Sequence, residues 1–229
     1  MRDPFARPAR FVERVGIAYL FGGPKAADLP NLHAEVTGLD RIDEWNEDTD
    51  VVWACRGELP LRGVAWYGEW LRGRGTFVAR RVLPAALGWM GRSADEEAEL
   101  AAAHRLSREA GTLYEVLLTE GPLASIELRE QAGHPGPAGT KSFQRSLHAL
   151  QRSLLITHYG AKVEQSAWAS GVFEPTQRAF PNCEPLDREE ALRVLVGLYR
   201  EIGGPDSVGA ARLFRAPVEE VRALLSNPG

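Results

Sequence analysis

The chain has 229 residues, enough for one large domain or for two to three small ones. Its 44% hydrophobic and 25% charged residues are ordinary for a globular protein. No apolar run is long enough to cross a membrane, and no signal-peptide pattern opens the chain. Cys55 and Cys183 form no CxxC spacing. We therefore expect a cytoplasmic protein with no membrane partner, no zinc site and no disulfide framework.

Residues 1–98 form the least regular segment, and we expect a domain that mixes helix and strand. Residues 10–21 are compatible with a helix, and residues 76–90 with an extended piece that runs into a helix near Pro84. Arginines next to aromatic side chains suit stacking on extruded or single-stranded bases, although Trp and Tyr are also ordinary core residues. The residues concerned are Trp45, Trp53, Trp66, Trp70, Trp89, Arg56, Arg62, Arg80 and Arg81 and, as the group to test, Tyr67, Arg72 and Arg74.

The middle segment, residues 99–183, opens with two expected helices. The first covers about residues 101–119, and Gly121-Pro122 ends it. The second covers about residues 125–132, with Ser125 as its N-cap. Residues 134–140 (HPGPAGT) are expected to form a loop.

A third helix is predicted for residues 141–154, because apolar residues recur there at helical spacing. The apolar stripe consists of Phe143, Leu147, Leu150 and Leu154. The opposite stripe carries Arg145, His148 and Arg152, with Lys141, Gln144 and Gln151 alongside. Arg and Gln in a row suit base edges and phosphates, since their forked donors match both. The alternative interpretation is a solvated helix face.

After this helix the sequence predicts a β-hairpin. Residues 154–158 are short, apolar and β-prone, Tyr159-Gly160 can turn, and residues 162–168 can pair back. Lys162 and Gln165 would lie on this wing, within reach of the DNA backbone. The order helix, short helix, recognition helix, hairpin is the winged-helix plan. We therefore expect residues 99–183 to be a winged-helix domain that binds duplex DNA.

Residues 184–229 predict a shorter unit of three helices. Asp187 and Asp206 are placed as N-caps, and Pro217 suits a first helical turn. The unit resembles a second helix-turn-helix, so we expect tandem winged-helix-like units in an α+β, mainly helical protein. Glu219 and Glu220 would repel phosphate in its last helix. This unit therefore favours a structural role or a homodimer contact.

The net charge of −4 by itself argues against binding to nucleic acid, but the charges are unevenly distributed along the chain. Residues 56–92 hold seven Arg against two Glu, and residues 141–182 hold two Lys and three Arg against two Glu. The acidic residues gather in residues 40–50, 95–99 and 184–190. A local basic patch can bind phosphates while the rest of the surface is acidic.

Several stretches in order resemble one family. Residues 146–160 (SLHALQRSLLITHYG), followed by Trp168, Phe173 and Phe180-Pro181, are similar to the winged-helix superfamily of AlkZ-like DNA glycosylases and AlkZ-related proteins. Residues 66–87 (WYGEWLRGRGTFVARRVLPAAL) resemble a segment of the AlkZ-related branch. Residues 190–225 resemble the third helical unit of the superfamily. The resemblance implies DNA binding and a role in DNA repair.

The chain departs from the glycosylases at their catalytic motif. They carry a paired Gln-x-Gln or Gln-x-Asp in the N-terminal third, whereas this chain has no Gln before Gln131. The counterpart stretch, residues 16–21, carries no carboxamide or carboxylate. A lone carboxylate can orient water for base excision, and Glu13, Glu35 and Asp40 are available. The resemblance therefore implies DNA binding more strongly than catalysis, and the catalytic residues stay unknown.

Three other functions remain open at this point. A divergent glycosylase would act on alkylated or crosslinked bases, a transcription regulator would be a dimer that reads two half-sites, and an interaction module would bind protein. The sequence has no P-loop, dinucleotide fingerprint, GxSxG or HExxH motif. We therefore expect no cofactor and no metal.

Overall fold

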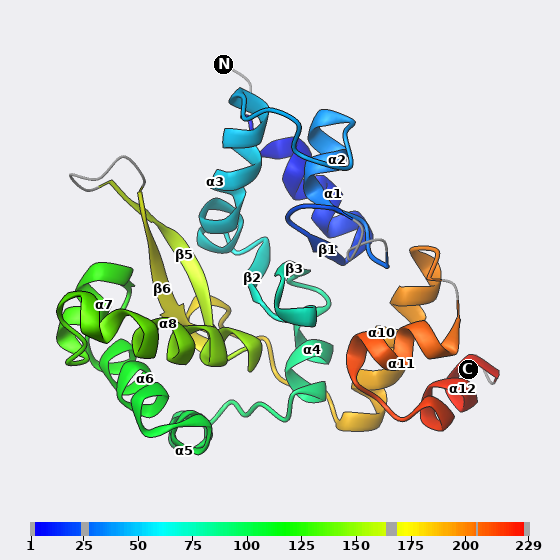
Figure 1. Ribbon diagram of the computed structural model, residues 1–229. Coiled ribbons are helices and arrows are strands. Elements are labelled where there is room, and N and C mark those ends of the chain that lie inside the picture. Colours follow the sequence, from blue (N-terminus) through cyan, green and yellow to red (C-terminus); the bar gives the residue numbers. More distant parts are fainter. Residues whose placement is uncertain (1–2, 24–27, 164–168, 205, 227–229) are drawn as a thin grey trace.

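A computed structural model describes residues 3–23, 28–163, 169–204 and 206–226. The protein is α+β and mainly helical, with two small antiparallel sheets, which confirms the predicted fold class. In Figure 1 the first part of the chain lies at the top, the middle part at the lower left and the last part at the lower right.

The first unit consists of helices around a three-stranded sheet. Its elements are α1 (Ala6–Val15), β1 (Ile17–Tyr19), α2 (Leu32–Thr37), α3 (Glu47–Leu61), β2 (Ala65–Glu69), the 3-10 turn η1 (Leu71–Gly73), β3 (Gly75–Ala79) and α4 (Leu83–Trp89). The strands are antiparallel and lie in the order β1-β3-β2. The prediction of one helix over residues 10–21 was wrong, because Gly16 ends α1 with a φ of 78° and β1 follows. The extended piece that leads into a helix near Pro84 is confirmed as β3 and α4.

The second unit repeats that arrangement with a different sequence. Its elements are α5 (Glu96–Leu106), α6 (Arg108–Glu120), β4 (Leu123–Ala124), α7 (Ser125–Gln131), α8 (Gly136–Arg152), β5 (Ile156–Lys162), β6 (Ser170–Pro175) and α9 (Thr176–Ala179). The strand order is β4-β6-β5. In both sheets, therefore, the first strand pairs with the third, and two helices separate the first strand from the second.

Two helix boundaries in the second unit differ from the prediction. The predicted helix over residues 101–119 is two helices, because the Ser107 backbone is extended and its hydroxyl accepts the N–H of Ala110 at the start of α6. Helix α8 begins at Gly136, so most of the loop expected at residues 134–140 is its first turn.

The hairpin also differs from its prediction. Tyr159 and Gly160 lie inside β5, where the pairing has a register shift between His158 and Ala161, rather than forming the turn. The return strand is Ser170–Pro175 instead of residues 162–168, of which 164–168 lie outside the described residues. The expected N-cap Ser125 is the first residue of α7, and Glu127 accepts the N–H of Ala124 before it.

The last three helices are α10 (Arg188–Glu201), α11 (Ser207–Phe214) and α12 (Val218–Ser226). Asp187 and Asp206 cap the first two, as predicted. Their buried faces join the core of the first unit, while α5–α8 and the β4-β6-β5 sheet surround a second core. The division into residues 1–98, 99–183 and 184–229 stays a prediction.

The two sheet-bearing units contact each other reciprocally. Helix α3 of the first packs against β5 of the second, and α8 of the second packs against β2 of the first. Figure 1 shows the β5–β6 hairpin rising beside α3. At the α3–β5 contact, a Cβ on Gly57 would lie 2.8 Å from the backbone of Gly160, so two glycines let the backbones approach. This packing fixes the walls of the cleft described below.

Candidate nucleic-acid interface

A cleft of about 630 Å³ opens between the two units. Residues of α3, β2 and the start of β3 form one side, and residues of α7, α8, β5 and β6 form the other. A volume of this order is typical of small-ligand sites. The structure therefore places the predicted recognition helix along the edge of a cleft.

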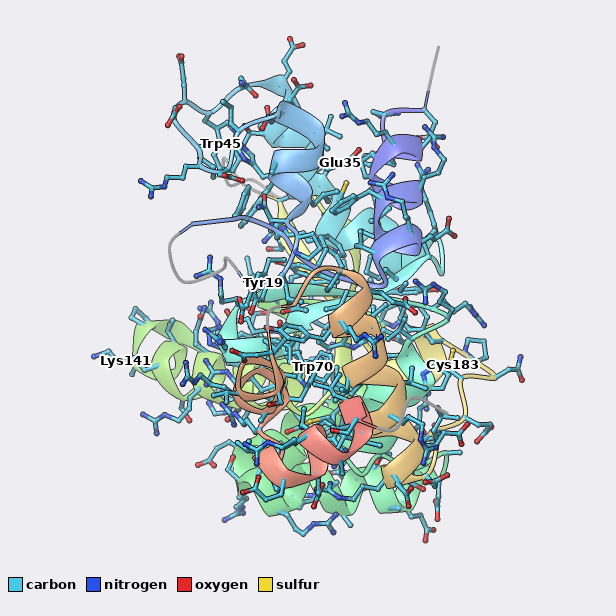
Figure 2. The ribbon with its side chains drawn as sticks, turned by 90° about the vertical axis from the view of Figure 1, so that its right-hand side faces the viewer. Tyr19, Glu35, Trp45, Trp70, Lys141 and Cys183 are labelled. Atoms are coloured by element: carbon cyan, nitrogen blue, oxygen red, sulfur yellow. The ribbon has the colours of Figure 1, made fainter. Side chains whose placement is uncertain are left out.

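The first half of the predicted polar stripe on α8 is exposed. The opposite, apolar stripe of α8 is buried in the second core and consists of Phe143, Leu147 and Leu150. Lys141, Gln144 and Arg145 are exposed on α8, and Gln144 also lines the cleft. Figure 2 shows Lys141 at the outer edge of this helix, directed away from the molecule. These three side chains are available to a ligand.

The second half of the stripe is packed against the first unit. Nδ1 of His148 lies 3.4 Å from the carboxylate of Glu69 at the end of β2, and Nη2 of Arg152 lies 3.5 Å from the same oxygen. Both side chains are still partly accessible, because their exposed fractions are 36% and 53%. The structure thus brings two of the predicted DNA contacts to a carboxylate instead of leaving them in solvent.

Two buried hydrogen-bonding residues complete this contact between the units. Gln151 is 3% exposed, and its Oε1 accepts the N–H of Glu69 at 3.1 Å. Thr157 on β5 is fully buried, and its hydroxyl accepts the N–H of Tyr67 and donates to the carbonyl of the same residue, both at 3.1 Å. The sequence places Gln151 beside the polar stripe, and no pattern in it indicates that Glu69 is the hydrogen-bond partner.

The three predicted residues of the first unit are engaged within the protein. Arg72 pairs with Asp28 at 2.9 Å. Arg74 donates to the carbonyls of Phe21 and Gly22 at 3.4 and 3.1 Å and lines the cleft. Tyr67 also lines the cleft but is 7% exposed, and burial raises the pKa of its hydroxyl.

The wing carries one described candidate, Lys162. Its ammonium group pairs with Glu127 of α7 at the end of β5. Val163 next to it is 87% exposed. Gln165, the other candidate on the wing, lies outside the described residues.

The sequence places Trp53 and Arg56 among the aromatic and arginine residues of the first segment but does not indicate that they form a pair, which faces the cleft from α3. The guanidinium carbon of Arg56 lies 3.5 Å from the Trp53 ring centroid, and both residues line the cleft. Burial lowers the pKa of Arg56, and none of the ion pairs between described residues includes it. The i, i+3 spacing on one helix was the available signal. Arg56 is therefore a half-buried cation held by an aromatic ring.

His158 lies on the same cleft from β5. Its ring contacts Tyr67 at 5.1 Å and Phe173 at 4.5 Å between centroids. Burial, and then the positive charge of Arg56, lower the pKa of His158 to about 3, so the imidazole is neutral at physiological pH. Its Nδ1 is buried and has no hydrogen-bond partner among the described residues. This nitrogen is thus an unsatisfied buried polar atom of a residue that lines the cleft.

The carboxylates considered for water activation lie away from the cleft. Glu35 pairs with Arg7 and Arg14, and Figure 2 shows it on the upper unit, far from Lys141. Glu13 and Asp40 do not line the cleft either. Among the described residues that do, Glu69 is the one carboxylate.

Two further features concern the described part of the chain. No three His, Cys, Asp or Glu side chains lie together there in a way that could hold a metal ion. No described helix has the length and apolar character that crossing a membrane requires.

Comparison with known proteins gives one family assignment. No curated protein and no solved structure matches the chain. The sequence profile of the family described as AlkZ related matches residues 5–210, which covers both sheet-bearing units and α10. The chain therefore belongs to the AlkZ-related family.

Proposed function

We propose that the protein binds duplex DNA through the first half of α8 and that it serves DNA repair. Membership of the AlkZ-related family supports the repair role, because the name relates the family to DNA glycosylases that the sequence resembles. The chain lacks the Gln-x-Gln motif of those enzymes. DNA binding is therefore the part of their function that this chain is best equipped to perform.

The order of the elements supports a tandem winged-helix arrangement. Helix, short strand, two helices and a two-stranded hairpin follow one another in α6–β4–α7–α8–β5–β6. The same order holds for α1–β1–α2–α3–β2–β3, with the same pairing of first and third strands. In such a unit the third helix is the one that reads DNA, which makes α8 and α3 the candidates.

The observation that carries the proposal is the exposed, unpaired state of Lys141, Gln144 and Arg145. All three side chains are exposed, and neither Lys141 nor Arg145 has an ion-pair partner among the described residues, whereas Arg152, Arg72 and Lys162 each do. Unpaired cations on a helix surface can neutralise phosphates without first breaking an internal contact. Gln144 and Arg145 can also reach base edges.

The test is fluorescence-anisotropy binding to a short duplex at two salt concentrations. We expect the wild type to bind more weakly at high salt, and the variant Lys141→Ala/Arg145→Ala to reduce the slope of log Kd against log salt by about 2. The control Arg193→Ala/Arg222→Ala removes two cations from α10 and α12 that pair with neighbouring glutamates. Absence of binding at low salt, or an equal loss in the control, would contradict the proposal.

A second candidate, base excision by a divergent glycosylase, depends on Glu69. Its carboxylate lines the cleft and is 30% exposed between His148 and Arg152. An ionised carboxylate can orient a water molecule toward the sugar carbon that loses its base. Incubation with alkylated duplex tests this: release of free base by the wild type and its loss in Glu69→Gln is the expected pattern, and no release overturns it.

A homodimer through α10–α12 remains a prediction. The buried faces of these helices already join the core of the first unit, and Val194 and Val208 are their exposed large apolar side chains. The mass in solution, measured by light scattering, tests it. A dimer would favour a transcription regulator, and a monomer favours repair.

A further inference from the structure

We propose that the inner wall of the cleft binds one unpaired nucleotide, with its phosphate on Arg56 and its base on the neighbouring aromatic rings. The proposal deepens the proposed function and rests on it, because it names what the same cleft would accept from bound DNA. Two independent observations point to a ligand here: a cation without an acidic partner, and a buried nitrogen without a hydrogen-bond partner.

The first observation concerns the charge of Arg56. Burial lowers the pKa of this guanidinium, which means that the protein surroundings disfavour the charged form. Glu58, the nearest acid along α3, pairs with Arg62 instead. A half-buried charge is normally compensated by a partner. A phosphate from a ligand would supply that compensation, and its oxygens match the guanidinium donors.

The position of Arg56 is fixed before any ligand arrives. Its guanidinium lies over the Trp53 ring at 3.5 Å, in the range of a cation–π contact. Trp53 in turn lies 6.2 Å from Phe21, with 21° between the ring planes. All three residues line the cleft. The cation is therefore stacked on one aromatic ring, and a second ring lies next to that pair at the cleft.

The second observation is the neutral, unpartnered His158. The residue lines the cleft and is 9% exposed, and its buried Nδ1 has no hydrogen-bond partner among the described residues. A buried polar atom without a partner costs free energy until a ligand or water satisfies it. Bases and sugars offer both donors and acceptors. His158 can therefore bind a polar atom of the nucleotide whichever nitrogen carries the proton.

The charge and the volume of the cleft favour a nucleotide over other ligands. The lining includes Arg56, Arg74 and Arg129 against the single carboxylate of Glu69, so it favours an anion. A cleft volume of about 630 Å³ is large enough for a single nucleotide. A duplex cannot enter with both strands, whereas a nucleotide that has left the stack can. An unpaired nucleotide supplies the anion and the aromatic base together.

The experiment compares two duplexes of the same sequence, one intact and one with a single unpaired nucleotide, by anisotropy. The readout is the ratio of the two Kd values, so a general loss of binding does not affect it. We expect the wild type to prefer the bulged duplex by about tenfold, since stacking of one base supplies an effect of that order. Arg56→Gln should bring the ratio close to one, and the control Arg193→Gln should leave it unchanged.

A second experiment measures the binding of small molecules and does not require the protein to bind a duplex. Tryptophan fluorescence is followed while a deoxynucleoside monophosphate, the matching nucleoside or inorganic phosphate is added. We expect the monophosphate to bind more tightly than either other probe, and Arg56→Gln to abolish that advantage. Thermal unfolding of Arg56→Gln shows whether the variant is folded.

Failure of the two proposals can be distinguished. Equal binding of both duplexes by the wild type, or a preference that survives Arg56→Gln, overturns the nucleotide site and leaves DNA binding intact. If neither duplex binds, the DNA-binding proposal fails. In that case Arg56-dependent binding of the monophosphate would still support the nucleotide site, and its absence would overturn both.

Discussion

Helices α3 and α8 occupy the same place in two units of the same topology, but their surfaces differ. The first turn of α3 carries Glu47, Asp48 and Asp50, whereas the first turn of α8 carries no acid. Acids stabilise a helix N-terminus, but they repel phosphate. Only α8 combines the position of a third helix with exposed cations. The two helices therefore share a topology but differ in charge, and the proposal of DNA binding through α8 depends on that difference.

The two helices also contact the opposite unit by different means. Helix α3 meets β5 through backbone contact at Gly57 and Gly160, with no room for a Cβ. Helix α8 meets β2 through the polar side chains of His148, Gln151 and Arg152. The difference shows that the second half of α8 contacts the first unit through polar side chains. The following substitutions test each side of that contact.

Thr157→Val should have the largest effect, because it acts where both sides meet. It would leave the buried N–H and carbonyl of Tyr67 without their partner. We expect the free energy of unfolding to fall by about 4 kcal/mol, because two buried polar groups would each be left without a hydrogen bond. Urea denaturation measures it. Thr112→Val, which removes an exposed hydroxyl on α6, is the control and should change little; similar losses in both variants would contradict the account.

Gly57→Ala tests the α3 side. The new Cβ would lie 2.8 Å from the Gly160 backbone, so one of the two backbones must move. We expect a loss of about 3 kcal/mol, also by urea denaturation. Gly197→Ala on α10 is the matched control, since no atom lies within 4 Å of its Cβ position, and it should be neutral or stabilising. If Gly57→Ala is as well tolerated as Gly197→Ala, the close contact is absent in solution.

Gln151→Ala tests the α8 side. It removes the acceptor for the N–H of Glu69 from a buried position. A loss of about 2 kcal/mol is expected in the same measurement. Gln144→Ala, seven residues earlier on the exposed part of α8, should stay close to the wild type. Equal effects of the two glutamine substitutions would show that the polar contact does not form.

Glu69→Gln should have the smallest effect on stability. Its partners His148 and Arg152 are partly exposed, so water and salt screen both ion pairs. We expect a change below about 1 kcal/mol that shrinks at high salt. Glu189→Gln, which breaks the exposed pair with Arg193, provides the reference. A salt-independent loss much greater than the reference would mean that the Glu69 contact is buried and stronger than described.

Secondary-structure elements could be predicted where their signals are local in the sequence. Phe143, Leu147 and Leu150 recur at helical spacing and are buried as that spacing predicts. Asp187 and Asp206 cap the helices that follow them. Residues 10–21 show the limit of such signals: their apolar pattern suits a helix, but Gly16 allows a left-handed turn and the chain pairs with β3 instead.

The candidate site could be foreseen only in part, because its partners are distant in sequence. Gln151 and Glu69 are 82 residues apart, and no periodicity relates them. The sequence therefore predicted one continuous polar stripe on α8, and only the docked first unit divides it. The unpaired state of Arg56 could not be predicted for a different reason. Arg56 follows an acidic stretch, and only the structure shows that Glu58 pairs with Arg62 instead.

The most direct measurement compares the two halves of the α8 stripe. Duplex binding and urea denaturation are measured for Lys141→Ala/Arg145→Ala and for His148→Ala/Arg152→Ala. We expect the first variant to lose DNA affinity at unchanged stability, and the second to retain most of its affinity and to be the less stable of the two. If the second variant loses as much affinity as the first or more, at wild-type stability, then the half that contacts Glu69 is the DNA-binding surface and the account is contradicted.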